Sequence, residues 1–207
     1  MKGAWKPLGA ALALLLATAV GATATAIDPA QLYPRLAARP AGAPDRGGLA
    51  YALGNGLVVT LVADFDGIVK DVQPSDLKTM GLTPAQAQKR ALENLSLYFR
   101  GGKLRLSQLS GPRDGPYVLC DGYWLCSSLI LYPELADWAG EILGSEDLYL
   151  SVPHRDALFV FKKGKKSDPG EWKKFIAQQA SEGTDQLTPE LFEIKDKSVR
   201  PVAAKPK

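Results

Sequence analysis

Apolar residues alternate with polar ones in several short stretches, and this spacing predicts strands. The β-branched residues on both sides of Asp66-Gly67 predict a hairpin, with strands near 57–63 and 68–73 and a tight turn at that dipeptide. The same alternation on either side of Pro153–Asp156 predicts a second hairpin. Further strands are expected at 104–109, at 117–120 and at 190–194.

Other stretches show the three- and four-residue spacing of a helix with one buried face. The clearest covers about 84–99, where Thr83 is suited to cap the helix, Pro84 to occupy its first position and Gln86 to complete a capping box. Another helix is expected near 169–181.

Two further stretches are predicted to be helical, and in each of them a proline limits or interrupts the helix. Asp28 and Gln31 match a capping box, which predicts a short helix whose length Pro34 limits. Apolar spacing from residue 127 or 128 onward predicts another helix. Because proline lacks a backbone donor, Pro133 requires that this helix begin near Tyr132 or be distorted there.

Together these elements predict the α+β class, with a largely antiparallel sheet and about three helices packed on it. We expect a single α+β domain at 49–194, preceded at 27–48 by the N-terminal helix and a connection rich in Pro, Gly and Ala. Residues 195–207 contain little apolar mass, which predicts a disordered basic tail.

Residues 1–26 have the pattern of a secretory signal peptide. Two lysines precede an apolar run from Leu8 to Val20, and Ala24-Thr25-Ala26 fits a cleavage site, so the mature chain is expected to begin at Ile27. An uncleaved membrane anchor is the alternative, although the run is shorter than the roughly 20 residues that span a bilayer. The pattern predicts export to the periplasm or the medium.

Export also bears on the two cysteines, Cys120 and Cys126. An oxidising compartment favours a disulfide between them, which would fix a turn. Their spacing differs from the Cys-x-x-Cys of a redox dithiol, and two cysteines without a nearby histidine are too few for zinc. Two unpaired thiols are the remaining alternative.

The net charge of the mature chain argues against a nucleic-acid partner and excludes little else. Removal of Lys2 and Lys6 from the 25 basic residues leaves 23 against 22 acidic ones, so no global basic field remains. One local cluster stands out beside the second hairpin and could contact an anionic membrane surface or partner, or be a solvated strand end: Lys162, Lys163, Lys165 and Lys166.

His154 is the only histidine in the chain, and it lies at the tip of the second hairpin with Asp156 two residues away. That spacing allows contact and general acid–base chemistry, but a turn position is the plainer interpretation and predicts exposure. A nucleophile such as Ser128 would have to be brought to the pair by the fold, because the chain has no Gly-x-Ser-x-Gly motif around it.

No pattern predicts a cofactor or a metal site. Asp64 and Asp66 supply part of a calcium-type ligand set, but turn chemistry explains both of them. The chain also contains no glycine-rich loop that would cradle a phosphate.

From Leu57 onward the sequence resembles the YtpQ-like bacterial family. The matching stretches are "VVTLVAD", "GLTPAQAQKRALENL", "SSLIL" and "SVPHRDALFV". The family has no established activity, so the resemblance implies a fold and no reaction. By position it assigns shared polar or turn roles to Asn94, Ser128, Pro153, Arg155 and Asp156, whereas the export signal and His154 depart from the family pattern.

The sequence therefore favours a non-enzymatic exported module that binds a protein or a cell-envelope partner. The alternative is a hydrolase or small-ligand site around Asn94, Arg155 and Asp156, with His154 and Ser128 as further candidates. A pocket that joins Asn94 to the hairpin would favour the alternative, and an exposed apolar patch would favour the module.

Overall fold

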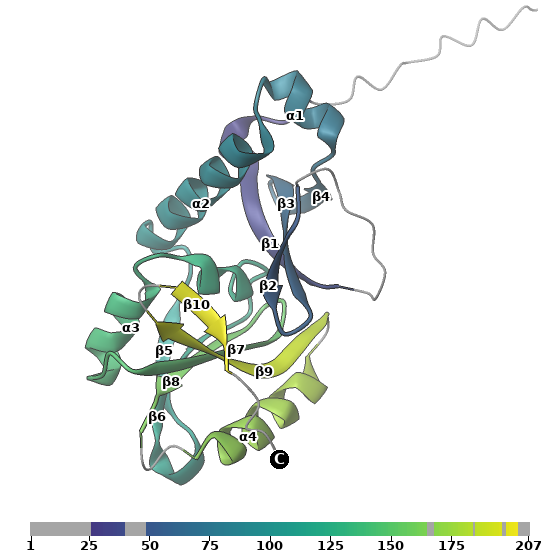
Figure 1. Ribbon diagram of the computed structural model, residues 1–207. Coiled ribbons are helices and arrows are strands. Elements are labelled where there is room, and N and C mark those ends of the chain that lie inside the picture. The colour runs from purple at the N-terminus through teal and green to yellow at the C-terminus, as the bar shows by residue number, and fades with distance from the viewer. Residues whose placement is uncertain (1–25, 40–48, 165–167, 184, 196–197, 203–207) are drawn as a thin grey trace, which may run out of the picture.

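The computed structural model describes residues 26–39, 49–164, 168–183, 185–195 and 198–202, so residues 1–25 of the predicted signal peptide lie outside the described residues. Within those residues the strands form two antiparallel sheets with helices packed on them, which confirms the α+β class (Figure 1). No helix in these ranges is long and apolar enough to cross a membrane.

Sheet A is built around one long central strand. β3 (Leu57–Phe65) pairs along one edge with β1 (Leu32–Ala38) and along the other with β2 (Tyr51–Gly54) and β4 (Ile68–Asp71). Asp66 and Gly67 both have positive φ at the β3–β4 turn, as the predicted hairpin requires.

Sheet B has six strands in the order β10-β9-β7-β8-β6-β5. The predicted hairpin around residues 153–156 forms its centre, as β7 (Leu148–His154) and β8 (Leu158–Lys162). The outer strands are β5 (Leu106–Ser110), β6 (Pro116–Cys120), β9 (Gln186–Lys195) and β10 (Ser198–Pro201).

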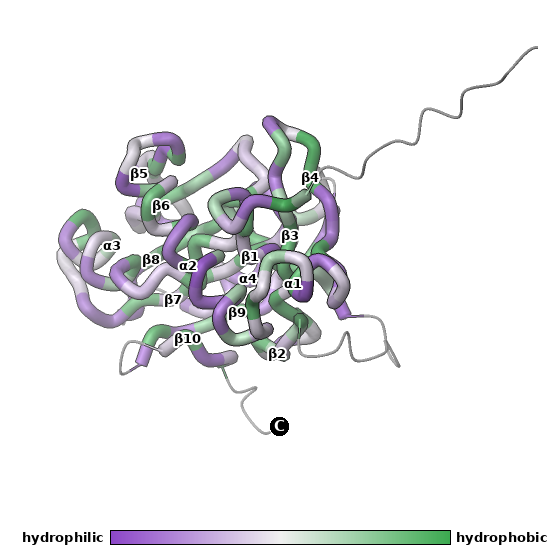
Figure 2. Tube along the Cα trace, turned by 90° about the horizontal axis from the view of Figure 1, so that it is seen from above, coloured by the Kyte–Doolittle hydropathy of each residue, from purple (hydrophilic) through white to green (hydrophobic). Residues whose placement is uncertain are grey.

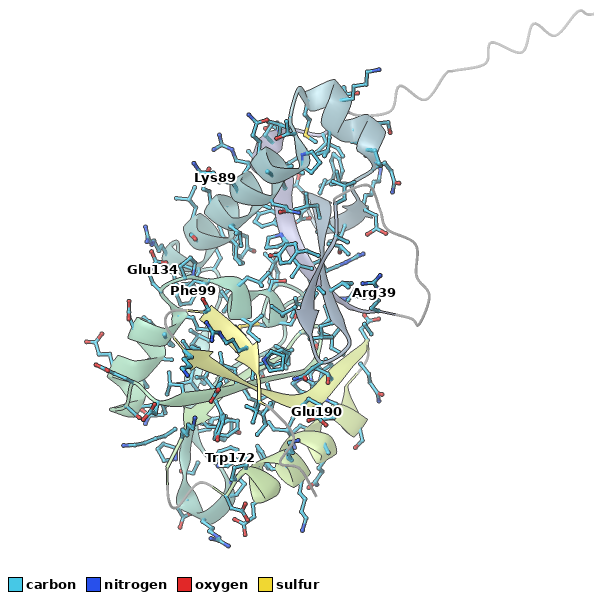
Figure 3. The ribbon with its side chains drawn as sticks, in the orientation of Figure 1. Arg39, Lys89, Phe99, Glu134, Trp172 and Glu190 are labelled. Atoms are coloured by element: carbon cyan, nitrogen blue, oxygen red, sulfur yellow. A yellow bond between two sulfur atoms is a disulfide. The ribbon has the colours of Figure 1, made fainter. Side chains whose placement is uncertain are left out.

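Helices cover the sheets on different faces. α2 (Pro84–Arg100) has the predicted capping box and packs Ala87 and Ala91 against β1 and β3. α4 (Pro169–Glu182) covers one face of sheet B, where Trp172 stacks on Phe161 with ring centroids 4.0 Å apart (Figure 3). α3 (Leu135–Leu143) and the 3₁₀ turn η3 (Ser127–Leu131) cover the opposite face.

The helix predicted around Pro133 is broken between η3 and α3. The chain forms one 3₁₀ turn, passes through the proline and resumes as a helix at Leu135, so the predicted helix is divided. Phe99 of α2 packs edge-on against Tyr132 and Trp138 at this break, and Arg100 pairs with Glu134 (Figure 3).

The predicted N-terminal helix is wrong beyond its first turn. The capping box of Asp28 and Gln31 is present, but it closes only the 3₁₀ turn η1 (Pro29–Gln31), and strand β1 follows. Leu32, Pro34 and Leu36 are buried on one face of β1, and this alternation overrides the local helix signal. The sheet therefore extends into the segment 27–48, which was predicted to precede the domain.

Three elements were not predicted. Residues 198–201 form β10, so the segment predicted to be a disordered tail includes a strand that pairs with β9. The helix α1 (Pro74–Met80) follows β4, and β2 precedes β3. β9 also begins at Gln186, four residues before the predicted strand.

Candidate functional site

The hairpin that carries His154 is a packed corner of the molecule. His154 Nδ1 contacts the Asp156 carboxylate, as their spacing predicted. The prediction of exposure is wrong, because the His154 side chain is only 15% exposed, and its ring lies so close to Gly183 that no side chain would fit there. Gly183 therefore closes one side of the imidazole.

Arg155 is held on both its backbone and its side chain. Its N–H donates to the carbonyl of Asp185 at 3.2 Å, and its guanidinium lies 3.1 Å from the Asp185 carboxylate. Its carbonyl accepts a 3.2 Å hydrogen bond from the N–H of Ser127. These contacts join the hairpin to the start of β9 and to η3.

A small pocket of about 360 Å³ lies beside the hairpin, and its lining includes His154 and Asp156. The other lining residues contain no serine, threonine or cysteine that the imidazole could activate: Leu119, Asp121, Ala157, Phe159, Gln179 and Gly183. Among the described residues, the lining thus places an imidazole beside a carboxylate but supplies no hydroxyl or thiol nucleophile.

Ser127 and Ser128 are fully buried in η3. Their hydroxyls have no hydrogen-bond partner among the described residues. The backbone of Ser127 contacts Arg155, so the structure brings this turn to the hairpin. Because neither serine lines the His154 pocket, the structure does not assemble a Ser–His–Asp set around it.

Asn94 has a separate role in the fold. From the buried face of α2 its amide donates to the carbonyls of Pro29 at 2.8 Å and Leu32 at 2.9 Å. These bonds fix the entry into β1 on sheet A, whereas Arg155 and Asp156 lie in the β7–β8 turn of sheet B. The structure does not bring Asn94 together with the hairpin.

The cysteines form the predicted disulfide, with Cα atoms 5.4 Å apart. The loop that they close carries Tyr123 and Trp124, whose rings pack against Tyr33 and Tyr98. Tyr98 donates a 2.6 Å hydrogen bond to the Tyr123 hydroxyl. Burial, together with this bond, raises the pKa of Tyr98 well above the ordinary value of a phenol.

A polar pocket of about 340 Å³ lies beside this tyrosine cluster, and Asp64 and Asp66 contribute to it. Asp64 accepts a 2.8 Å hydrogen bond from the N–H of Gly67, which confirms its predicted turn role. No group of three or more metal-binding side chains occurs in the described ranges.

The lysine cluster is partly engaged within the molecule. Lys162 donates to the carbonyl of Gly144 at 3.2 Å, and Lys163 lies 2.7 Å from the Glu193 carboxylate. The hydrogen bond to Glu193 raises the pKa of Lys163. Lys165 and Lys166 lie outside the described residues.

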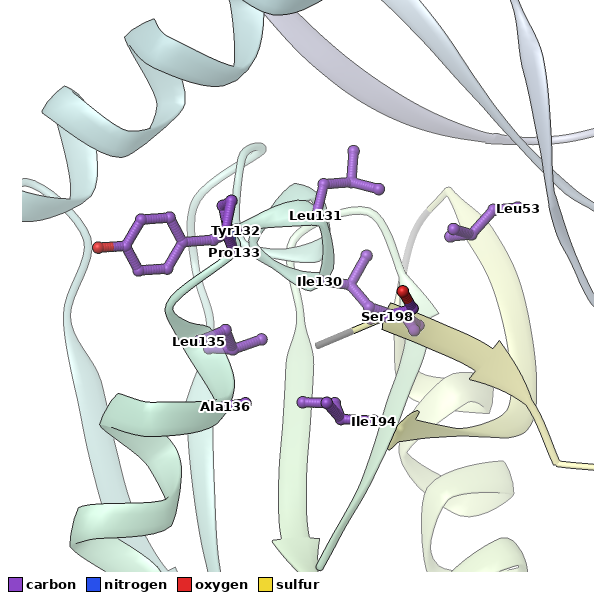
Figure 4. Close-up of a pocket in the computed structure, with 10 residues that line it drawn as sticks. Leu53, Ile130, Leu131, Tyr132, Pro133, Leu135, Ala136, Ile194 and Ser198 are labelled. Atoms are coloured by element: carbon purple, nitrogen blue, oxygen red, sulfur yellow. The ribbon is translucent and has the colours of Figure 1, made fainter. Parts of the chain in front are cut away.

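An apolar socket of about 280 Å³ opens between η3, α3 and the β9–β10 hairpin (Figure 4). Figure 4 shows side chains from these elements and from β2 facing one another around it. The lining consists of Leu53, Ile130, Leu131, Tyr132, Pro133, Leu135, Ala136, Ile194, Ser198 and Val199. None of these residues carries a charge.

The socket continues into an acidic groove of about 870 Å³ along α3. Ala136 and Ile194 line both cavities, so the two share a wall. Asp137, Glu141 and Glu146 are the charged residues among those described in its lining, which include no lysine or arginine. An apolar depression therefore adjoins a negatively charged one.

The sequence did not predict this surface. It requires β10, which was predicted to be disordered, and the break at Pro133, which turns Leu131 and Leu135 toward the β9–β10 hairpin. Phe192 and Ile194 alternate with Glu193 and Lys195, and Val199 lies between two polar residues, so this pattern could have indicated an additional hairpin.

Comparisons of the chain with protein-family models, with curated proteins and with solved structures each return no match. The geometry of the chain itself is therefore the basis for inferring its function.

Proposed function

We propose that the chain is a non-enzymatic binding module that recognises a segment of a protein partner through the apolar socket and the acidic groove. The observation that carries the proposal is the shared wall at Ala136 and Ile194, which joins an uncharged cavity to one lined by three carboxylates. Such a surface fits an apolar side chain flanked by lysine or arginine.

The size of the socket supports a side-chain anchor. At about 280 Å³ it has room for one apolar side chain. Burying one leucine-sized side chain there would contribute about 1.5–3 kcal/mol. Basic flanking residues would add attraction to Glu141 and Glu146 and would exclude acidic competitors.

The residues of the alternative, a hydrolase or small-ligand site, make contacts within the fold. This observation favours the binding module over the alternative. Asn94 is bonded to the backbone that enters β1, Arg155 is tied to Asp185, and Asp156 contacts His154. These contacts lie within the fold, and no described residue lining the His154 pocket is a serine, threonine or cysteine.

We include in this proposal that the chain shares its fold with the YtpQ-like family. Asn94 and Arg155, which carry part of the resemblance, make contacts between separate segments, and Asp156 contacts His154 within the hairpin. Such residues mark a shared fold more directly than a shared reaction. The proposal also includes export, supported by the Cys120–Cys126 disulfide and the signal-peptide pattern.

The test is a fluorescence-anisotropy titration with labelled peptides that combine a central Leu or Ala with flanking Lys or Glu. We expect the Leu and Lys peptide to bind at least tenfold more tightly than either single exchange, a difference of about 1.4 kcal/mol. Ala136→Arg, which obstructs the shared wall, should abolish this preference.

The matched control is Ile142→Arg, which adds the same charge to the same helix at an exposed residue outside both linings. It should bind the peptides like the unaltered chain. Equal binding of all peptides, or equal loss in both variants, would contradict the proposal.

A further inference from the structure

We infer that the outer edge of β5 pairs with the same strand of a second copy of this chain, which forms a symmetric dimer. The inference goes beyond the proposed function and is independent of it. β5 lies at one end of sheet B and β10 at the other, so such a dimer would leave the socket beside β10 open. Figure 2 places β5 at the periphery of the molecule.

The other sheet edges in the described residues carry features that discourage edge-to-edge pairing. β10 contains Arg200 and Pro201, β1 contains Pro34 and Arg35, and β4 contains Lys70 and Asp71. β2 is interrupted by a register shift between Ala52 and Gly54, and Gly54 lies against Pro201.

β5 has none of these features. Its sequence, Leu-Ser-Gln-Leu-Ser, has no charge and no proline, and it pairs with β6 in an unbroken register. Four of its five residues are exposed, including Leu109 at 41%. A regular, uncharged edge of this kind is a template for another strand.

The hydrogen-bond pattern shows which backbone groups point outward. Gly111 donates to the carbonyl of Gly115 at 2.8 Å, so its N–H points toward β6. Because the N–H directions alternate along a strand, the N–H groups of Ser107 and Leu109 also point toward β6. The outward-pointing N–H groups are therefore those of Leu106, Gln108 and Ser110.

The strand is self-complementary about Gln108. A two-fold axis there pairs Gln108 with its own copy and Leu106 with the copy's Ser110, and each pair exchanges both N–H···O=C bonds. On the other face, Leu109 of one copy lies diagonal to Leu109 of its partner, and apolar contacts between them add to the pairing.

Charge does not oppose this arrangement within the strand. The nearest basic residues, Arg105 and Arg113, lie beyond its two ends, and Arg113 is already 2.6 Å from the Glu171 carboxylate. A five-residue strand pair covers less than the roughly 800 Å² per partner of a standard interface, so we expect a weak, concentration-dependent dimer.

The test is sedimentation velocity of the mature chain, from low micromolar to several hundred micromolar. We expect reversible dimerisation in the upper part of this range. Gln108→Pro removes an outward N–H without removing a bond to β6, so it should weaken dimerisation at least tenfold while the thermal unfolding midpoint stays close to that of the unaltered chain. Gln108→Thr, which keeps the N–H, is the control.

Cysteine crosslinking tests the register. Residues that face each other across the axis lie about 5.5 Å apart at Cα, within the range of roughly 4.4–6.8 Å for a disulfide. Oxidation should therefore crosslink Gln108→Cys far more than Ser110→Cys, which faces a different residue. A monomer at every concentration, an unaffected Gln108→Pro dimer, or stronger crosslinking at residue 110 would overturn the inference.

Discussion

Several polar side chains that resemble catalytic groups in the sequence make contacts with other parts of the fold. Asn94 bonds two carbonyls, Arg155 is tied to Asp185, and the His154 ring is enclosed by Gly183 and Asp156. Their contribution should therefore appear in stability rather than in ligand binding.

Asn94→Ala tests this most simply. It leaves the carbonyls of Pro29 and Leu32 without their buried donor, so we expect the free energy of unfolding to fall by about 1–3 kcal/mol. Urea unfolding measures the change, and Ser96→Ala in the same helix is the control with a smaller expected loss. Unchanged stability would show that the two bonds contribute little.

Ser128 should behave in the opposite way. Its hydroxyl is buried without a partner among the described residues, so Ser128→Ala removes a desolvated polar group. We expect the free energy of unfolding to stay the same or rise by up to about 1 kcal/mol. A large loss of stability in urea would show that the hydroxyl is satisfied in solution.

Tyr98 gives a pH-dependent prediction. Its pKa is raised in the folded state, so the folded chain binds the phenolic proton more tightly than the unfolded chain does. The resulting stability is complete below the unfolded pKa of about 10 and is lost as the pH rises above it toward the folded pKa. Unfolding measured between about pH 9 and 11 should show a steeper loss in the unaltered chain than in Tyr98→Phe. Parallel profiles would contradict this.

At the scale of elements, the disulfide acts by placing a loop. Cys120 and Cys126 are six residues apart, so the bridge removes less chain entropy than a 15-residue loop would and should stabilise by less than about 3 kcal/mol. Its larger effect is to hold Tyr123 against Tyr98.

A Cys120→Ala, Cys126→Ala double variant separates the two effects. We expect a loss below about 3 kcal/mol in urea unfolding and a clear change in the near-ultraviolet circular dichroism of the tyrosine cluster. Reduction of the unaltered chain should reproduce the spectral change. An unchanged spectrum would show that packing alone places the loop.

Elements with a strong local signal were predictable from the sequence. The capping box at Thr83 and the turn at Asp66-Gly67 each determine local geometry, and α2 and the β3–β4 hairpin form as expected. At Asp28 the same capping signal yields a single 3₁₀ turn, because pairing with β3 buries alternate residues of the following segment. Tertiary pairing of this kind leaves no local signature.

The candidate site was less predictable because it is made by distant segments. Leu53, Leu131, Ile194 and Val199 come from four elements, and only the fold brings them together. Single residues within the hairpin, by contrast, were placed correctly relative to each other, since His154 and Asp156 are close in sequence.

In the whole molecule, the two proposed interaction surfaces lie at opposite ends of sheet B. The β10 end carries the socket and the acidic groove, and the β5 end carries the edge inferred to pair with a second copy. A dimer of this form would present two grooves, so a partner with repeated binding segments would gain avidity.

The proposed function requires that the socket contact a protein partner. The most direct measurement is photocrosslinking in the native host from a benzophenone amino acid at Ser198, an exposed residue of the lining, with the same group at Glu93 on α2 as the control. We expect a discrete protein crosslink from residue 198 that Ala136→Arg abolishes. Equal crosslinking from both positions, or a crosslink that persists in Ala136→Arg, would contradict it.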